Sequence, residues 1–229
     1  MIKDIRGIVF DIGQTLAYYP IPLNWSALYR PAFGYVAERN GLALTESDYK
    51  SIADTLAKYN ARINPREEEV SSDTIFTEII NGTSIPKDRL DAVREDFYSY
   101  FRTDVYVYED AAAALRAKGI ITATFSDVAY GMDNRYALED IRDIIGLIDI
   151  PFTSNDAGFR KPNKTGLMIL SGKMGIPVSA MMFVGEEEKD IKCALSAGAV
   201  SVLIDREEKG HDFGQDIMIK SLAELPKLL

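Results

Sequence analysis

A carboxylate at the end of the first apolar run is the clearest candidate for chemistry in this chain. Residues 7–10 read Gly-Ile-Val-Phe, and Asp11 follows them directly. Such a run predicts a strand buried on both faces, so Asp11 would lie at the edge of a parallel sheet where α/β proteins place their ligands. There a carboxylate can ligate a metal or act as a covalent nucleophile. The plain alternative is that Asp11 only caps a turn, since Asp and Gly are ordinary turn residues.

Polar side chains also follow the later apolar runs, at the points where further strands are expected to end. They are one hydroxyl, one lysine and several carboxylates: Ser126, Asp127, Lys161, Glu186 and Asp190. Each has a structural alternative, because Ser126 suits a helix N-cap, Lys161 a surface position and residues 186–188 a solvated helix start. Their coincidence at consecutive strand ends favours one shared site with Asp11.

The composition of the 229 residues excludes several classes of protein. A formal charge of −9 argues against nucleic-acid binding, which requires clustered Lys and Arg. No stretch approaches the ~20 apolar residues of a membrane span, and no signal-peptide pattern is present, so we expect a cytoplasmic protein. The single cysteine, Cys193, excludes an internal disulfide framework and is expected to be packed. The single histidine, His211, lies in a Gly/Asp-rich loop, so any metal would be bound by oxygen donors, which favours Mg²⁺.

The apolar pattern separates a sheet-forming part from a helical insert. After the strand at 7–10, the Tyr/Pro-rich passage 18–22 cannot continue regular structure. Four helical patterns follow with no strand between them, at residues 25–40, 45–60, 72–81 and 86–101. From residue 108 helices and strands alternate, which is typical of parallel βαβ units. The helices are expected at 111–118, 134–147, 164–174 and 190–197, and the strands at 120–125, 150–152, 181–184 and 201–204.

The order of the polar motifs resembles the haloacid dehalogenase-like (HAD) hydrolase superfamily, and the resemblance covers nearly the whole chain. Residues 11–16, Asp-Ile-Gly-Gln-Thr-Leu, are similar to its nucleophile motif and Ser126 to its hydroxyl motif. Lys161-Pro162 is similar to its lysine motif, and residues 184–190 are similar to its acidic motif. The resemblance implies an α/β fold with a Rossmann-like parallel sheet core, residues 1–17 and 104–229. It also implies an inserted four-helix cap domain of the first type, residues 18–103.

The resemblance also implies a role for each motif. Asp11 would attack the electrophile, which in most members is phosphorus, with Ser126 and Lys161 as the other catalytic residues. Neighbouring carboxylates repel one another and are hard to ionise unless a cation balances their charge, so Mg²⁺ is implied as the cofactor. Its ligands would be Asp11, the backbone carbonyl of Gly13, Glu186 and Asp190. The substrate would be bound by Thr15, which would also orient its loop, and by Ser126, Asp127 and Lys161.

Three positions depart from the family pattern. The phosphatases carry a second aspartate two residues after the nucleophile, as general acid and base, and here that residue is Gly13. General acid–base assistance contributes roughly 10²- to 10⁴-fold to a rate, and no side chain at this position can supply it. Gln14 replaces the usual glycine, and Glu186 replaces the more usual aspartate of the acidic motif.

Three functions are compatible with these residues. The first, which we expect, is Mg²⁺-dependent hydrolysis of a small phosphate ester or acyl phosphate through an aspartyl-phosphate intermediate. It would be slow on alkyl phosphates unless the cap supplies another acid. The second is hydrolysis at carbon, as in dehalogenases or phosphonate-cleaving members, which also lack the second aspartate. The third is a non-catalytic relative that binds phosphate or a partner. Tyr18 or Tyr19 is expected to reach over the pocket, and Pro20 and Pro22 suggest a hinge for cap closure.

Overall fold

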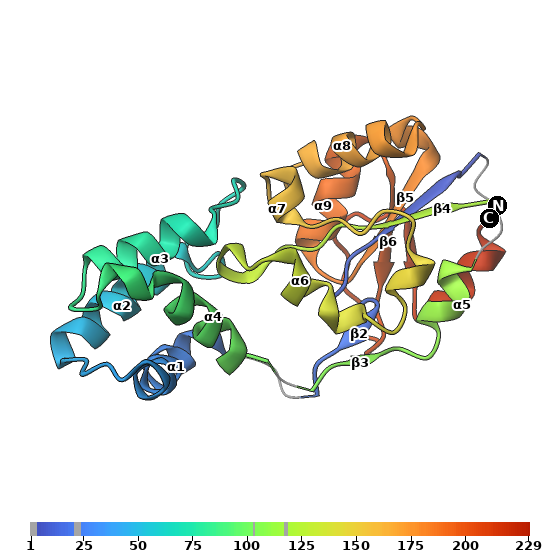
Figure 1. Ribbon diagram of the computed structural model, residues 1–229. Helices are drawn as coiled ribbons and strands as arrows, with labels where there is room; N and C mark the ends of the chain where they lie inside the picture. The colour runs from blue at the N-terminus through green and yellow to red at the C-terminus, as the bar shows by residue number, and fades with distance from the viewer. Residues whose placement is uncertain (1–3, 21–23, 103, 117–118) are drawn as a thin grey trace.

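The computed structural model describes residues 4–20, 24–102, 104–116 and 119–229, which form a sheet lobe and a helical lobe (Figure 1). The sheet lobe is built on five parallel strands in the order β4-β1-β5-β6-β7. Their bounds are β1 Gly7–Phe10, β4 Ile121–Thr124, β5 Met181–Gly185, β6 Val200–Ile204 and β7 Ile217–Ile219. The register places Phe10 beside Thr124 and Val184, so the residues that follow these three strands emerge together.

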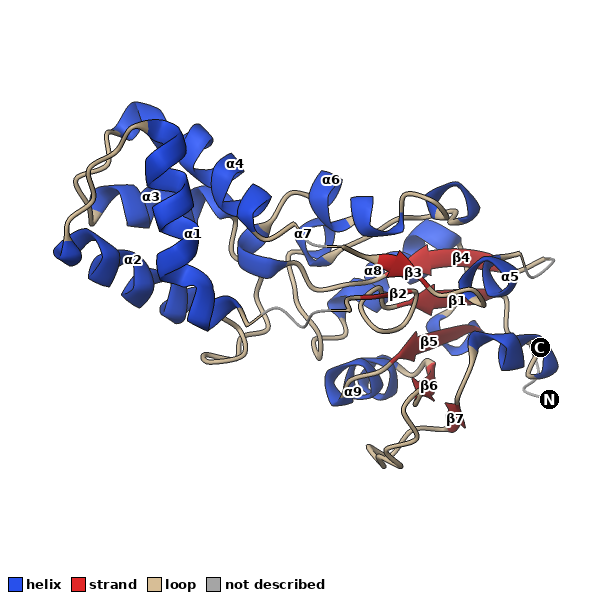
Figure 2. Ribbon diagram, turned by 90° about the horizontal axis from the view of Figure 1, so that it is seen from below, coloured by secondary structure: helices blue, strands red, loops and turns tan. Residues whose placement is uncertain are grey.

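Helices cover both faces of this sheet, as Figures 1 and 2 show. On one face lie α8, Thr165–Met174, and α9, Glu188–Ala197, over a core that includes Phe125 and Phe183. On the other face lie α5, Ala111–Leu115, and the 3₁₀ helix η6, Leu222–Lys227. Cys193 is fully buried, as predicted. The remaining short elements are η2 Ala129–Gly131, α6 Asn134–Ala137, η3 Glu139–Ile141, η4 Ile145–Leu147, α7 Ser154–Ala157 and η5 Val178–Ala180.

The helical lobe contains the four long helices that the periodicity predicts. They are α1 Trp25–Asn40, α2 Glu46–Tyr59, α3 Ser72–Asn81 and α4 Leu90–Tyr100, the last preceded by η1 Lys87–Arg89. Thr45 and Asp48 form a capping box at the start of α2, which satisfies two of its free amide groups. Phe33, Phe76 and Phe97 are fully buried at the centre of the lobe. No helix of the described ranges is long and apolar enough to cross a membrane.

One side chain of the sheet lobe is buried inside the helical lobe. Tyr130, four residues after Ser126, packs in the apolar cluster of the helical lobe and is only 4% exposed. Its hydroxyl lies 2.5 Å from that of Tyr29, and its carbonyl accepts a hydrogen bond of 2.8 Å from Tyr98. Its φ of 52° lies in the left-handed region, which costs a non-glycine residue about 1 kcal/mol or more. These contacts join the two lobes through a shared apolar core.

Four predicted elements need correction. The helix expected at 134–147 is divided into α6, η3 and η4. The strand expected at 150–152 is reduced to an isolated bridge between Ala123 and Ile150, because Pro151 has no N–H to continue the ladder. The passage 18–22 is partly regular, since β2, Ala17–Tyr18, pairs with β3, Tyr106–Val107. Helix α5 ends at Leu115, and residues 117–118 of the expected helix, like Pro22 of the expected hinge, lie outside the described residues.

Candidate active site

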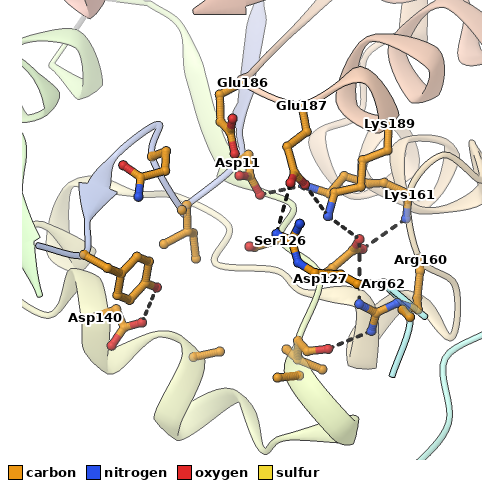
Figure 3. Close-up of a pocket in the computed structure, with 18 of the residues that line it drawn as sticks. Asp11, Arg62, Ser126, Asp127, Asp140, Arg160, Lys161, Glu186, Glu187 and Lys189 are labelled. Carbon is orange, nitrogen blue, oxygen red and sulfur yellow. Dashed lines mark hydrogen bonds and ion pairs between the residues drawn. The ribbon is translucent and has the colours of Figure 1, made fainter. Parts of the chain in front are cut away.

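A cleft of about 1700 Å³ lies where the carboxyl ends of the strands face the helical lobe. Figure 3 shows its floor. The structure brings six of the predicted site residues into it from four separate parts of the chain. These residues are Asp11, Gly13, Ser126, Asp127, Lys161 and Glu186. The shared edge of the parallel strands therefore gathers the predicted polar side chains in one place.

Asp11 stands at the end of β1 on the floor of the cleft, with 7% of its surface exposed. Its backbone N–H donates to the carbonyl of Val184 at 2.9 Å, which ties it to the neighbouring strand β5. Lys161 donates from Nζ to its Oδ1 at 2.6 Å. The carboxylate is thus held by one oxygen in a fixed position at the cleft, as a nucleophile or a metal ligand requires.

Lys161 supplies a fixed positive charge beneath Asp11. The residue is 3% exposed, and its Nζ lies 2.7 Å from Asp190 Oδ1 in addition to its bond with Asp11. Burial alone would lower the pKa of Lys161, but the carboxylates of Asp11, Asp190 and Asp127 outweigh it and hold the pKa well above its usual value. The ammonium group is therefore charged at any physiological pH and balances the anionic floor of the cleft.

Asp127 is surrounded by cations and does not present its carboxylate to a ligand. Its Oδ1 accepts the backbone N–H of Lys161 at 3.0 Å, and its Oδ2 lies 3.3 Å from Lys189 and 3.9 Å from Arg160. Burial opposes ionisation, but Lys161, Lys189 and Arg160 lower the pKa of Asp127 below its usual value. Ser126 is half-buried, and its carbonyl accepts the N–H of Ser154 at 2.9 Å. Figure 3 shows Ser126 and Asp127 together below Asp11.

Glu186 carries negative charge that the cations leave unbalanced. Burial, and then the charges of Glu187, Asp11 and Asp190, raise its pKa to about 7. Although no group of three or more His, Cys, Asp or Glu among the described residues is arranged to hold a metal, Asp11, Glu186 and Gly13 all line the cleft. Hard oxygen donors with excess negative charge fit Mg²⁺, which commonly keeps several waters or substrate oxygens as ligands.

Two predicted site residues lie behind the cleft rather than in it. Asp190 is 1% exposed, and its carboxylate is occupied by Lys161 and by the backbone N–H of Glu187 at 2.9 Å. It therefore holds Lys161 in place from behind the cleft. Thr15 is fully buried, and its Oγ1 has no hydrogen-bond partner among the described residues. A substrate cannot reach Thr15, which belongs to the packing of the loop.

The nucleophile loop is held in a strained conformation by aromatic and cationic side chains. Gln14 has a φ of 54°, a region that glycine adopts freely and glutamine does not. Its Oε1 accepts a hydrogen bond of 3.2 Å from the hydroxyl of Tyr108. Arg206 lies over the Tyr108 ring at 3.6 Å and donates to the carbonyl of Thr15 at 3.0 Å. A glycine at position 14 would adopt this turn without help, whereas Gln14 is held in it by contacts from Tyr108 and Arg206.

Gly13 leaves open space toward one tyrosine. A Cβ added at Gly13 would lie 3.7 Å from Cε2 of Tyr19, an ordinary contact. Tyr19 lines the cleft and donates from its hydroxyl to Asp140 at 2.6 Å, while Tyr18 stacks on Tyr106 away from the cleft. Burial and then the charge of Asp140 raise the pKa of Tyr19 far above its usual value. The tyrosine is therefore a hydrogen-bond donor beside Gly13 that keeps its proton.

Several residues around the site were not predicted from the sequence. Arg160 directly precedes Lys161, and this position could have indicated that it belongs to the site. Lys189 lies within a charged run whose pattern is typical of a solvent-exposed helix start. Glu69 comes from the helical lobe and contacts Arg160 across the lobe boundary, and no local pattern marks it. His211 also lines the cleft, where its ring stacks on Phe213.

Comparison with known proteins supports the interpretation of the geometry. A family model described as HAD-hydrolase-like matches residues 158–225, a segment that includes Lys161 and the acidic motif. Phosphoglycolate phosphatase from Shigella dysenteriae is 23% identical over 240 residues, which cover 97% of this chain and 92% of that protein. Both matches agree with the resemblance of the motifs to the haloacid dehalogenase-like hydrolase superfamily.

Solved structures of HAD hydrolases share the fold of this chain. A 2-haloacid dehalogenase from Pseudomonas syringae pv. Tomato matches with a TM-score of 0.66 and 18% identity, over 98% of this chain and 97% of the other. A protein from Bacillus subtilis described as a HAD hydrolase and solved with bound magnesium matches with a TM-score of 0.58 and 17% identity, over 99% of both chains. The predicted α/β class with a Rossmann-like parallel sheet is confirmed.

Proposed function

We propose that this protein is a HAD-like, Mg²⁺-dependent phosphohydrolase that acts through Asp11 on small phosphorylated substrates with good leaving groups, such as acyl or aryl phosphates. The observation that carries the proposal is the pairing of Asp11 with Lys161 at 2.6 Å in a cleft that Glu186 also lines. A nucleophile held over a fixed cation and next to a cation site suits attack on an anionic electrophile. The phosphoglycolate phosphatases among its relatives support phosphorus as the target.

The proposed chemistry uses protein groups that line the cleft, together with a bound Mg²⁺. An oxygen of Asp11 attacks phosphorus as the bond to the leaving-group oxygen breaks, and water then hydrolyses the aspartyl phosphate and restores the carboxylate. Ser126 would donate to a phosphoryl oxygen, and Lys161 would balance the charge gathered on Asp11 and the phosphoryl group. Asp127 would contribute through its backbone N–H, since its carboxylate is occupied. Mg²⁺ bound by Asp11, Glu186 and the Gly13 carbonyl would neutralise the developing charge.

The leaving group receives no proton from position 13. Gly13 has no side chain, and the neighbouring Tyr19 keeps its proton in its bond with Asp140. A leaving group that departs as a stable anion needs little protonation, whereas an alkoxide needs the full assistance of an acid, worth roughly 10²- to 10⁴-fold. We therefore propose acyl or aryl phosphates before alkyl phosphates.

Hydrolysis at carbon is the second candidate, because Gly13 is equally consistent with a reaction that needs no acid at this position. In that reaction Asp11 would displace a halide from carbon and form an ester, which water then hydrolyses. The cation site at Glu186 would have no role in it. Dependence on Mg²⁺ therefore separates the two candidates.

The test is hydrolysis of a panel of aryl, acyl and alkyl phosphates and 2-haloacids, each with and without Mg²⁺. Asp11→Asn, which keeps the size of the side chain, is the background control. We expect turnover of aryl and acyl phosphates that requires both Mg²⁺ and Asp11. Equal rates for wild type and Asp11→Asn on every phosphate would refute the proposal, and Mg²⁺-independent dehalogenation would establish the second candidate.

A further inference from the structure

A segment of the helical lobe runs alongside the residues that lead into Lys161. The backbone N–H of Arg160 donates to the carbonyl of Glu67 at 2.7 Å, and that of Glu69 donates to the carbonyl of Gly158 at 3.0 Å. Between them Glu68 and Phe159 form an antiparallel bridge. The helical lobe is therefore joined by main-chain hydrogen bonds to the loop that carries the lysine of the site.

Glu69 is a buried carboxylate that the proposed chemistry does not use. Its side chain is 4% exposed, and its Oε2 accepts hydrogen bonds from Arg160 Nη1 and from Ser154 Oγ, both at 2.5 Å. Its Oε1 accepts the N–H of Val70 at 3.0 Å. Removing a carboxylate from water is costly unless such partners replace its hydration. Arg160, together with Arg66 Nη2 at 3.4 Å from Oε1, offsets the charge of Glu69.

The partners of Glu69 fix the loop that carries Ser126. Arg160 Nη1 also donates to the carbonyl of Val128 at 2.7 Å, and Ser154 Oγ accepts the N–H of Val128 at 2.9 Å. Both main-chain groups of Val128, two residues after Ser126, are thus held by side chains that Glu69 holds in turn. Arg160 directly precedes Lys161, so the same carboxylate connects both site loops.

We propose that Glu69 is a positioning residue of the active site. By holding Arg160 and Ser154, it fixes the Ser126 and Lys161 loops in the arrangement that Asp11 requires, and turnover depends on the docking of the helical lobe. The proposal rests on the proposed hydrolysis at Asp11. Small misplacements of catalytic groups, on the order of 1 Å, cost about 10²-fold in rate, which makes a distant carboxylate consequential.

The test is Glu69→Gln, which keeps the shape of the side chain and removes its charge. Glu68→Gln is the matched control, because Glu68 is exposed and meets the sheet lobe through its backbone bridge. For an aryl phosphate we expect kcat to fall about 10- to 100-fold while KM changes less than about threefold. Hydrogen exchange is expected to speed up in residues 126–132 and 154–161 and to stay unchanged in β5. The control should show neither effect.

Two results would overturn the positioning role. An unchanged kcat would show that the contacts are only structural, whatever the exchange rates do. A lost kcat with unchanged exchange in both loops would show that Glu69 does not act through Arg160 and Ser154. If Glu69→Gln does not fold, Ser154→Ala removes the Ser154 bonds to Glu69 and to Val128 while Arg160 stays paired, and kcat and exchange are expected to change in the same direction. If the wild type hydrolyses no phosphate, the proposed function fails, while the exchange measurement still decides whether Glu69 orders the loops.

Discussion

The two loops that meet at the floor of the cleft are held in opposite ways. In the lysine loop, residues 158–161, both cations are buried and each contacts at least two carboxylates. The nucleophile loop, residues 11–15, contains a glutamine in the left-handed region, a buried threonine hydroxyl without a partner among the described residues, and a glycine facing the cleft. The lysine loop therefore has the charged groups that an anionic substrate needs, whereas the nucleophile loop has no side chain at position 13 that could transfer a proton.

The two loops therefore differ in what they contribute to the reaction: one binds the substrate and the cation, and the other would have to assist the leaving group. The lysine loop and Glu186 supply what an anionic substrate and a divalent cation need, so attack by Asp11 is supported. Nothing at position 13 supports departure of a poor leaving group. Each of the following substitutions acts on one of the two loops or on Glu186, and their effects should differ accordingly.

Lys161→Met should have the largest effect. It leaves Asp11, Asp190 and Asp127 without their shared cation, and breaking a buried ion pair costs about 3–5 kcal/mol. We expect kcat/KM to fall by about 10³-fold, in the range for a lost electrostatic group, and urea denaturation to show the lost stability. In the double variant Lys161→Met, Asp190→Asn, part of the stability should return but not the activity. Recovery of both would contradict a direct role for Lys161.

Gly13→Asp should repair the incomplete loop. Gly13 is not in the left-handed region, and the nearest atom to an added Cβ is Tyr19 Cε2 at 3.7 Å, so the side chain fits. A carboxyl here would act as a general acid, and we expect hydrolysis of alkyl phosphates to rise about 10- to 100-fold with little change for aryl phosphates. The ratio of the two kcat/KM values is the measurement. Gly13→Asn is the control of equal size, and an equal gain in it would exclude proton transfer as the cause.

Glu186→Gln should change stability in a pH-dependent way. The folded pKa of Glu186, about 7, lies above its ordinary value of 4.5, so the folded state binds the extra proton between these values and loses stability as the pH rises through 7. Removing the charge should add about 1–2 kcal/mol at pH 8, after allowance for partial exposure, and little at pH 5. Urea denaturation at both pH values measures this. Mg²⁺ should reduce the difference at pH 8, and an equal gain at both pH values would contradict the assignment.

Gln14→Gly should have the smallest effect. Glycine relieves the left-handed strain of about 1 kcal/mol but loses the hydrogen bond from Tyr108, worth a similar amount, so the net change should stay within about 0.5 kcal/mol. Gln14→Ala keeps the strain and loses the bond, and should therefore be about 1 kcal/mol less stable than Gln14→Gly. Thermal unfolding of the two variants measures the difference. Equal stability would show that the loop carries no strain.

The sequence predicted the elements whose pattern is local. Residues 25–40 and 72–81 are helices with the expected bounds, because their apolar spacing and their caps agree. The segment 134–147 failed because contacts with other segments decide it: Asp140 binds Tyr19, and Glu139 binds Arg102 of the helical lobe. Periodicity alone cannot show that such contacts divide a helix.

The candidate site follows the same rule. Asp11, Ser126 and Glu186 were found because each comes after a strand, and parallel strands end at one edge. Lys161 was found from its motif, although the strand expected before it is only an isolated bridge. The expectation that Asp190 is a metal ligand missed its burial behind Lys161, because Glu186 and Asp190 share one sequence motif and the motif does not show which of them is exposed to the cleft. The assignment of residues 18–103 as a cap domain stays a prediction, as do the roles of the site residues.

The burial of Tyr130 in the helical lobe has a consequence for the way the molecule unfolds and changes. The ring of Tyr130, from the sheet lobe, is part of the apolar core of the helical lobe, so neither lobe is an independent module. Thermal unfolding should therefore be a single cooperative transition. Excising the insert would expose Tyr130 and the apolar residues around it to water. A chimera with the helical lobe of a relative should fold only if that lobe also has an apolar pocket that can bury Tyr130.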